Sequence, residues 1–341
     1  MNEFISEVVS AILFISAGVG IMFAYYFGSN WLLDTIFADR INPDGTVVKS
    51  YANTRRRVRP WLMVAPALIF LSIYLFYPAA ATFYFSFFNA NSTEFVGLEN
   101  YKWAINNDAF RQAVFNNVLW ILIVPFASTA IGLLIAVLAD RVRWESIAKA
   151  FIFMPMAISF VGASIIWRFV YDVNPPGEPQ IGILNAVVTA LGGEPINWLN
   201  QPPLNNFMLM IILIWIQTGF AMVLLSSALK AVPEETLEAA RIDGANDIQI
   251  FFRIMIPQIM PTIAVVMTTI LITTLKVFDI VQVMTNGQSD TEVLANFMFR
   301  WMFRGTGDDG KAAVIAVTIM VATVPFLIWN VRRFSREEQL R

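Results

Sequence analysis

The sequence predicts an all-α protein built around a bundle of about seven transmembrane helices. Of its 341 residues, 57% are hydrophobic and only 14% are charged, whereas soluble chains carry about 25% charged residues. The apolar residues also occur in long runs, and a helix needs about 20 such residues to cross a bilayer. Together these observations place the chain among membrane proteins.

Seven runs are long enough to be transmembrane helices. In chain order they are residues 8–27, 61–88, 118–139, 150–171, 207–229, 262–284 and 312–331. Five prolines lie inside these runs, at positions 66, 78, 125, 155 and 325. Packed transmembrane helices tolerate proline because neighbouring groups satisfy the freed carbonyl oxygens. The prolines therefore do not argue against these spans.

The basic residues concentrate in alternate loops, which indicates the orientation of the chain. Segments 38–60, 140–149, 230–261 and the tail after residue 331 hold 16 of the 23 Lys and Arg residues. The opposite loops hold Lys102, Arg111, Arg300, Arg304 and Lys311, and Arg168 and Lys276 lie within spans. Because cytoplasmic loops carry the excess of basic residues, we expect the N-terminus outside and the C-terminus in the cytoplasm. Segment 230–261 is then cytoplasmic.

Two residue types with versatile chemistry are missing from the chain. It has no cysteine, which excludes disulfides and thiol chemistry, and no histidine, which removes the usual general base and the commonest metal ligand. We therefore expect no catalytic site, no metal site and no enzyme activity, and we expect lipid but no nucleic acid as a partner. Glu3 and Glu7 precede the first apolar run, so the N-terminus does not resemble a cleaved signal peptide.

Residues 305–312 nearly match a nucleotide-binding pattern. Their sequence follows GxxxxGK, but Ala312 stands where a Ser or Thr hydroxyl would hold Mg²⁺. Asp308 and Asp309 would also place carboxylates where phosphates bind. We interpret the segment as a glycine-rich turn that leads into the last helix.

The most informative segment lies between Pro233 and Pro257, in the loop predicted to be cytoplasmic. Pro233 suits the first turn of a helix, and two glutamates follow it at the positive end of the helix dipole. Gly244 ends or bends this helix, and a second helical stretch over 247–256 is expected to stop at Pro257. The residues alone allow two interpretations of this compact knob, a docking site for another protein or an ordinary interfacial helix pair.

The spacing within this segment resembles the EAA loop of permease subunits in bacterial ABC importers. The resemblance rests on Glu238-Ala239-Ala240, on Gly244, and on the Ile-x-Ile-Pro sequence that ends at Pro257, where Ile256 replaces the usual Leu. It implies a type I ABC importer transmembrane fold, in which this loop is the coupling helix that inserts into a cleft of the ATPase subunit. The residues that it assigns to ATPase coupling are Glu238, Ala239, Ala240, Asp243, Gly244 and Pro257.

Other parts of the chain are similar to the carbohydrate branch of this family, which contains the maltose-type first permease and its α-glucoside relatives. These parts are Leu229-Lys230-Ala231-Val232-Pro233, Phe278-Asp279 and Thr285-Asn286-Gly287. The resemblance begins near residue 59 and does not cover residues 1–58, which we expect to form an extra span and a basic cytoplasmic segment. It divides the rest into a second span with an outer loop (59–111) and the importer domain (112–341), with its coupling loop at 233–261.

The resemblance implies that the chain forms half of the path for a carbohydrate and works with three kinds of partner. These are a second homologous permease, a dimer of ATP-binding subunits and an extracytoplasmic solute-binding protein. No cofactor is implied for this chain, because ATP and Mg²⁺ would be bound by the partner ATPase. The implied location is the bacterial cytoplasmic (inner) membrane, and the implied solute is an α-glucoside or another oligosaccharide.

The membrane site of this family lies on the helices that flank the coupling loop, so matching positions here are candidates for the substrate path. They are Ile216, Gln217, Phe220, Ile270, Thr273, Thr274 and Val277. The last four are spaced to share one helix face, and the Gln217 amide can donate to and accept from sugar hydroxyls. Thr and Gln side chains in membranes also bond neighbouring helices. The family has an aromatic residue and amides at the last three positions, so the site would bind a different sugar or lie mainly in the partner permease.

Lys276 and Asp279 are the notable ionisable residues of the sixth run, and at a spacing of three on a helix they can pair with each other. A proton relay is the alternative, but one carboxylate without histidine makes it weak, so a structural ion pair is favoured. A secondary transporter would need carboxylates in several spans and inverted repeats, and we see neither. A membrane enzyme would need a set of catalytic side chains, and none is visible in a chain without His or Cys. The ABC permease is therefore favoured, with a carbohydrate as the expected solute and another solute class as the alternative.

Overall fold

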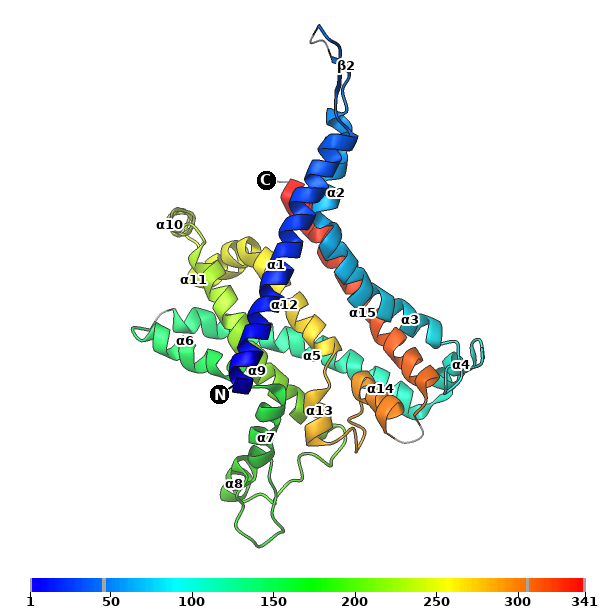
Figure 1. Ribbon diagram of the computed structural model, residues 1–341. Helices are drawn as coiled ribbons and strands as arrows, with labels where there is room; N and C mark the ends of the chain where they lie inside the picture. Colours follow the sequence, from blue (N-terminus) through cyan, green and yellow to red (C-terminus); the bar gives the residue numbers. More distant parts are fainter. Residues whose placement is uncertain (1, 45–46, 141, 305–306, 340–341) are drawn as a thin grey trace. The chain divides into compact units, whose positions relative to one another are not determined.

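The chain is an all-α protein, as predicted. The computed structural model describes residues 2–44, 47–140, 142–304 and 307–339 (Figure 1). Arg141 of the basic segment 140–149, Gly305 and Thr306 of the glycine-rich turn, and Arg341 of the basic tail therefore lie outside the described residues. In the described ranges, six helices are long and apolar enough to cross a membrane, and a bent helix pair would make a seventh. Strand pairing in these ranges is confined to a short hairpin and one bridge between Phe88 and Phe95.

The chain divides into two compact units, an N-terminal unit (Met1–Ala81) and a main unit (Thr82–Arg341). The boundary lies inside the predicted segment 59–111. The N-terminal unit contains α1 (Asn2–Ile36), β1 (Arg40–Ile41), β2 (Val47–Lys49), α2 (Ala52–Leu71), the π-helical turn η1 (Ser72–Phe76) and the first residues of α3 (Tyr77–Phe85).

In the N-terminal unit, α1 and α2 lie side by side and are joined by the β hairpin. The Tyr25 hydroxyl on α1 donates to the Leu62 carbonyl on α2 at 2.8 Å. Two ion pairs close the hairpin end, Arg59 with Asp34 at 2.7 Å and Arg55 with Asp39 at 3.0 Å. Part of the basic segment predicted at 38–60 therefore neutralises acidic residues at the end of α1 and in the loop after it.

The main unit is centred on three long helices, α5 (Asp108–Ala139), α9 (Leu204–Lys230) and α12 (Ile256–Leu275). Helix α9 is the most buried of the candidate membrane helices. In its most apolar stretch of 18 residues, 67% of the residues are buried. Its Leu209 and Ile212 belong to the core cluster that also contains Trp120 and Val124 of α5. The fifth predicted span is thus the central element of the unit.

A second apolar cluster joins the beginning of α5 to three other helices. These are α4 (Glu99–Asn106), α14 (Leu294–Phe303) and α15 (Asp309–Gln339). Trp103 of α4 stacks on Phe297 of α14 with ring centroids 6.2 Å apart. At the start of α15 the Asp308 carboxylate accepts from the backbone N–H of Lys311 at 2.9 Å, which is an ordinary helix cap. This agrees with a turn leading into the last helix.

The fourth predicted span, 150–171, is not one helix. Helix α6 (Glu145–Phe153) continues into the 3₁₀ turn η2 (Met154–Ala157), and α7 (Phe160–Val170) follows at an angle of 105°. Pro155 lacks a backbone N–H, Ile158 is extended, and the Ser159 hydroxyl caps the new helix by accepting from Gly162 N–H at 3.0 Å. The predicted span is therefore a sharply bent helix pair and not one continuous helix.

Two prolines are accommodated by π-helical turns and not by helix ends. The turn η1 (Ser72–Phe76) ends two residues before Pro78, and the turn η3 (Phe251–Met255) ends two residues before Pro257. A wider turn gives the chain room where proline removes a backbone N–H. Helix α11 (Asp247–Ile250) thus runs through η3 into α12, and the expectation that Pro257 stops the second stretch is wrong.

The sixth predicted span, 262–284, is also divided. Helix α12 ends at Leu275, and α13 (Asp279–Met284) begins after a break in which Phe278 is non-helical. Lys276 is exposed, and the ion pairs found among the described residues do not join it to Asp279. The predicted structural pair is therefore wrong, because the helix that would align the two residues ends between them.

Candidate functional site

The predicted helix after Pro233 is confirmed as α10 (Glu234–Ile242). Pro233 is its N-cap residue with an extended backbone, and Glu234 and Glu235 occupy the first turn. Their carboxylates therefore lie near the unpaired N–H groups at the positive end of the helix dipole. The helix starts where the local chemistry of the sequence predicts.

The connection between α10 and α11 (Asp247–Ile250) contains a C-terminal cap on the first helix and an N-terminal cap on the second. Gly244 has φ +84°, and the N–H groups of Gly244 and Ala245 donate to the carbonyls of Arg241 and Ala240 at 3.1 and 3.0 Å. This is a Schellman motif, which requires the left-handed conformation that glycine adopts without cost. Next, Asn246 and Gln249 bond each other's backbone N–H in a capping box. The two short helices therefore hold a defined angle.

The exposure of α10 separates its residues into two faces. Glu238, Ala239, Asp243 and Gly244 are exposed, whereas Ala240 is only 8% exposed and packs inward. Pro257 is exposed on the continuous α11–α12 helix. Of the six residues assigned to ATPase coupling by resemblance, five are thus available to a partner and Ala240 holds the helix in place.

The most prominent apolar residue of this knob is not among those predicted from the sequence. Ile242, at the end of α10, is 86% exposed, and Ile248 and Phe252 on the following helix are 71% and 63% exposed. Beside them is a groove of about 710 Å³ between α5, α9 and the knob, lined by residues such as Leu133, Leu237 and Phe251. A bulky apolar side chain next to a helix-ending Asp-Gly pair was the available signal.

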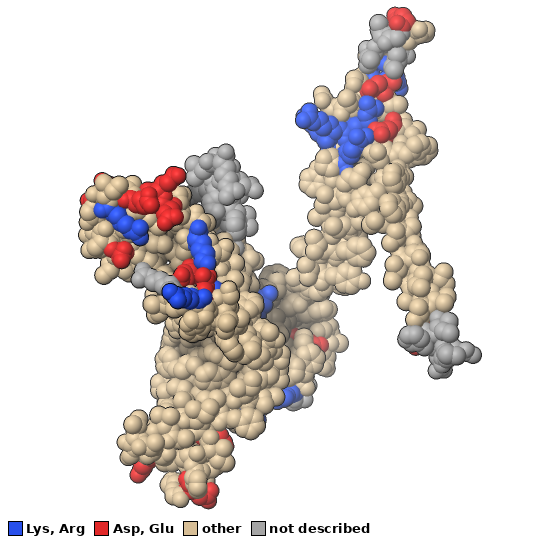
Figure 2. Space-filling view, turned by 90° about the vertical axis from the view of Figure 1, so that its left-hand side faces the viewer, with Lys and Arg blue, Asp and Glu red and all other residues tan. Residues whose placement is uncertain are grey.

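A charged network fixes the helices beneath the knob. The Lys149 ammonium on α6 bonds Asp140 at the end of α5, Glu145, and the Ser226 hydroxyl of α9, each at 2.5 Å. Lys230 at the end of α9 also pairs with Glu145. Figure 2 shows charged side chains gathered at one end of the main unit, above a body with few charges. The network links α9 to the consecutive helices α5 and α6, which lie far from it in the sequence.

At the other end of the main unit, asparagines hold the loop between α13 and α14. The Asn116 amide on α5 donates to the carbonyls of Asp290 and Glu292 at 2.7 and 2.8 Å. The Asn205 amide on α9 donates to Ser289 O at 2.6 Å, and Asn206 links Asn116 to the Trp120 indole. The loop is thus fixed to both central helices.

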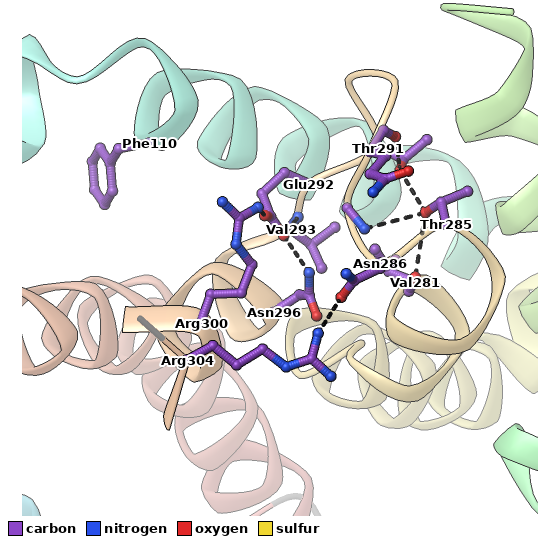
Figure 3. Close-up of polar contacts among 12 residues, drawn as sticks. Phe110, Val281, Thr285, Asn286, Thr291, Glu292, Val293, Asn296, Arg300 and Arg304 are labelled. Atoms are coloured by element: carbon purple, nitrogen blue, oxygen red, sulfur yellow. Dashed lines mark hydrogen bonds and ion pairs between the residues drawn. The ribbon is translucent and has the colours of Figure 1, made fainter. Parts of the chain in front are cut away.

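Glu292 in this loop is a buried carboxylate, only 4% exposed. Figure 3 shows Asn296 and Arg300 of α14 directed at it; Asn296 donates at 2.6 Å and Arg300 forms an ion pair. Burial raises the pKa of Glu292 above its ordinary value, although its hydrogen bond from Asn296 and the charge of Arg300 oppose this shift. The carboxylate also lies against Gly287, where a Cβ would be 2.6 Å from it.

The residues assigned to the substrate path occupy unlike environments. Ile216, Ile270 and Thr274 are at most 2% exposed, and Val277, at 6%, lies beyond the end of α12. The expectation that residues 270 to 277 share one helix face is therefore wrong for Val277. The Thr273 and Thr274 hydroxyls donate to carbonyls four residues earlier, at 3.1 and 2.8 Å, as threonines do inside helices.

Gln217 and Phe220 differ from these residues. Phe220 is half-buried, and the Gln217 side chain is 8% exposed yet forms no hydrogen bond in the described part of the chain. The amide atoms of Gln217 do not belong to the fully buried polar atoms that lack a partner, so they remain accessible to water or to another molecule. Of the seven candidates, Gln217 therefore has the geometry most compatible with a ligand, and all seven roles stay predictions.

Comparison with known proteins agrees with this architecture. The model of the family "Binding-protein-dependent transport system inner membrane component" matches residues 128–334. The chain is 56% identical to the alpha-glucoside transport system permease protein AglF of Rhizobium meliloti, over 97% of this chain and 98% of that protein. This alignment includes most of residues 1–58, so the N-terminal unit is shared with a relative although the motif resemblance does not reach it.

Two further similarities cover most of the chain. The osmoprotective compounds uptake permease protein GgtC of Synechocystis is 52% identical over 82% of this chain and 100% of that protein. A chain of a bacterial ABC transporter that imports the polysaccharide alginate has the same fold, with a TM-score of 0.70 and 20% identity over 83% of this chain and 98% of that one. The chain therefore belongs to the family of binding-protein-dependent transport system inner membrane components, the permease subunits of ABC importers.

Proposed function

We propose that this permease forms half of the translocation path for an α-glucoside or a related oligosaccharide. The observation that carries the proposal is the 56% identity to an alpha-glucoside permease along almost the whole chain. The nearly buried, unpartnered Gln217 amide supports it, because an amide can serve as donor and acceptor for the hydroxyls of a sugar.

We further propose that a second homologous permease completes the path, that a dimer of separate subunits binds and hydrolyses ATP with Mg²⁺, and that an extracytoplasmic binding protein delivers the sugar. The chain itself contributes no nucleotide site in this scheme. The distribution of basic residues supports an N-terminus outside, a C-terminus in the cytoplasm and α10 on the cytoplasmic side of a bacterial inner membrane.

The geometry of α10 supports a docking mechanism. Exposed Glu238, Asp243 and Ile242 would enter a cleft of the ATPase, while Ala240 and the caps at Gly244 and Asn246 keep the knob stiff. Closure of the ATPase dimer would displace the knob, and the Lys149 network would pass this displacement to α5, α6 and α9. Alternating access of the central path follows from that movement.

The test is uptake of radiolabelled sucrose, maltose and trehalose by cells that contain the complete transporter. We expect the wild type to import at least one sugar and Glu238→Lys to abolish import while the protein remains in the membrane. The control is Glu178→Lys, an exposed glutamate in the loop after α7, which should import normally. Uptake by Glu238→Lys at the wild-type rate would overturn the docking role.

A second candidate function is uptake of osmoprotective solutes, favoured by the 52% identity to an osmoprotective compounds permease. Growth of a strain that lacks the transporter distinguishes the two functions. If the transporter operates in osmoprotection, its deletion should impair growth at high salt when sucrose or trehalose is supplied. If it operates in nutrition, deletion should impair growth only where an α-glucoside is the carbon source.

A further inference from the structure

A polar pocket lies at the end of the main unit that is opposite to α10. It has a volume of about 360 Å³ and is formed by the end of α7, the segment before α9 and the loop between α13 and α14. In Figure 1, α7 and α13 lie at the lower end of the unit and α10 lies at the upper end. With α10 on the cytoplasmic side, as proposed above, this pocket opens on the outside.

The pocket is lined by side chains that lack partners within the chain. Arg168, Asn197, Asn200 and Gln288 line it, and in the described ranges their side chains form no hydrogen bond or ion pair. Asn286 accepts one bond from Arg304 at 2.9 Å and keeps its NH₂ group available. These four side chains are exposed, so water can reach them, and together with the Asn286 NH₂ group they give the cavity a polar lining that is open to a ligand.

The wall formed by the α13–α14 loop is preorganised. Asn286, Ser289 and Asp290 have φ of 53°, 53° and 61°, a region that residues other than glycine rarely adopt. The asparagines of α5 and α9 described above hold this backbone from behind. Asn286 is the one of these three residues that lines the pocket, and the fixed backbone around it positions its amide in advance.

The chemistry of the lining selects its ligand. Amides both donate and accept, and a guanidinium donates through several N–H groups, so the set matches a molecule with many hydroxyls. The lining contains no carboxylate, which disfavours a cation. A structural role at the negative end of the α7 dipole would explain Arg168 alone, and it does not account for the gathering of three exposed amides from two other segments around the same cavity.

We propose that this pocket is an entry site for the carbohydrate on the outer end of the permease, where the released sugar binds before it enters the membrane path. The inference rests on the proposed function, since it takes a sugar as the solute. It adds a site separate from Gln217 and the other path candidates, with Arg168 and Gln288 as its principal ligands.

The absence of cysteine from this chain allows a direct test. Asn200→Cys places a single thiol of this subunit in the pocket, and Glu194→Cys places one on an exposed site outside it. The complete transporter, made with cysteine-free partner subunits and reconstituted in liposomes, is labelled with a membrane-impermeant maleimide. Labelling is repeated with sucrose, maltose or trehalose, or with mannitol as an osmotic control.

We expect the transported sugar to slow labelling of Asn200→Cys without any binding protein present and to leave Glu194→Cys unaffected. Adding Arg168→Ala should raise the sugar concentration for half-protection by about tenfold, whereas Arg111→Ala, a paired arginine at the start of α5, should not. Equal protection by binding protein with and without sugar, and none by sugar alone, would show that the pocket receives a partner side chain, and would overturn the proposal.

Failure of this proposal and of the proposed function are distinguishable by uptake in the same preparation. If wild-type transporter imports a sugar that gives no protection of Asn200→Cys, the entry site is wrong and the function stands. If wild-type transporter imports none of the three sugars, the function is wrong and the pocket loses its assigned ligand class with it.

Discussion

Gly132 on α5 and Ala221 on α9 approach so closely that a Cβ on Gly132 would lie 2.6 Å from the Cβ of Ala221. Small residues at such crossings allow the backbones of membrane helices to pack directly. We expect Gly132→Val to destabilise the protein by about 1–3 kcal/mol, since the extra side chain overpacks the central helix pair. Thermal unfolding in detergent measures this loss of stability.

Gly18→Val is the control, because no atom lies within 4 Å of the corresponding Cβ position on α1. An equal loss of stability in both variants would contradict the prediction.

Gly244 ends α10 with φ +84° and has open space around its Cβ position. Gly244→Val is therefore disfavoured by the backbone conformation, at a cost of roughly 1–2 kcal/mol, and should change the angle of the knob. We expect sugar uptake to fall at least tenfold with normal amounts of protein in the membrane. Gly177→Val has comparable strain at φ +93° in the loop after α7, and its uptake should remain near the wild-type level.

Ile242 exposes 86% of its surface at the end of α10. If it enters an apolar cleft of the ATPase, Ile242→Asp should remove the stimulation of ATP hydrolysis by liganded binding protein. Leu191, 84% exposed elsewhere in the main unit, provides the matched substitution Leu191→Asp, which should leave the stimulation intact. ATPase assays on the reconstituted complex compare the two, and an equal effect would indicate a general loss of stability.

Glu292 provides a prediction about pH. Burial raises the pKa of Glu292 from its ordinary 4.5, while Asn296 and Arg300 oppose the shift. The folded protein therefore holds this proton more tightly than the unfolded chain, so the group stabilises the fold at low pH and loses that contribution as pH rises through its folded pKa. The melting temperature of the wild type relative to Glu292→Gln should fall as pH rises from about 4.5 toward neutrality. A difference that does not change with pH would show that Arg300 fully compensates for burial.

The local chemistry of the sequence was sufficient to predict α10, because Pro233 and Gly244 act through their own backbone preferences. It was insufficient for the bend between α6 and α7. Pro155 breaks a predicted span, whereas Pro125 lies inside the continuous helix α5, so the residue type alone does not separate the two outcomes. The difference lies in Ser159, which caps a new helix.

The candidate sites show the same division. The coupling residues follow from a motif with fixed spacing, whereas the Lys149 network joins α5, α6 and α9 and depends on how these helices pack. Asp140, Glu145 and Ser226 carry no pattern that identifies them as its members. The pocket around Arg168 likewise gathers three separate segments, so its residues become a set only in the folded chain.

The π-helical turn η3 lies between α11 and α12 and affects the register of α12. A π turn contains one residue more than an α turn, so a change of Phe251–Met255 to regular α-helix would advance every later residue of α12 by one position. One position corresponds to a rotation of about 100° around the helix axis. Such a rotation would exchange the directions of neighbouring residues such as Thr273 and Thr274, and a displacement at α10 would thereby become a twist inside the membrane.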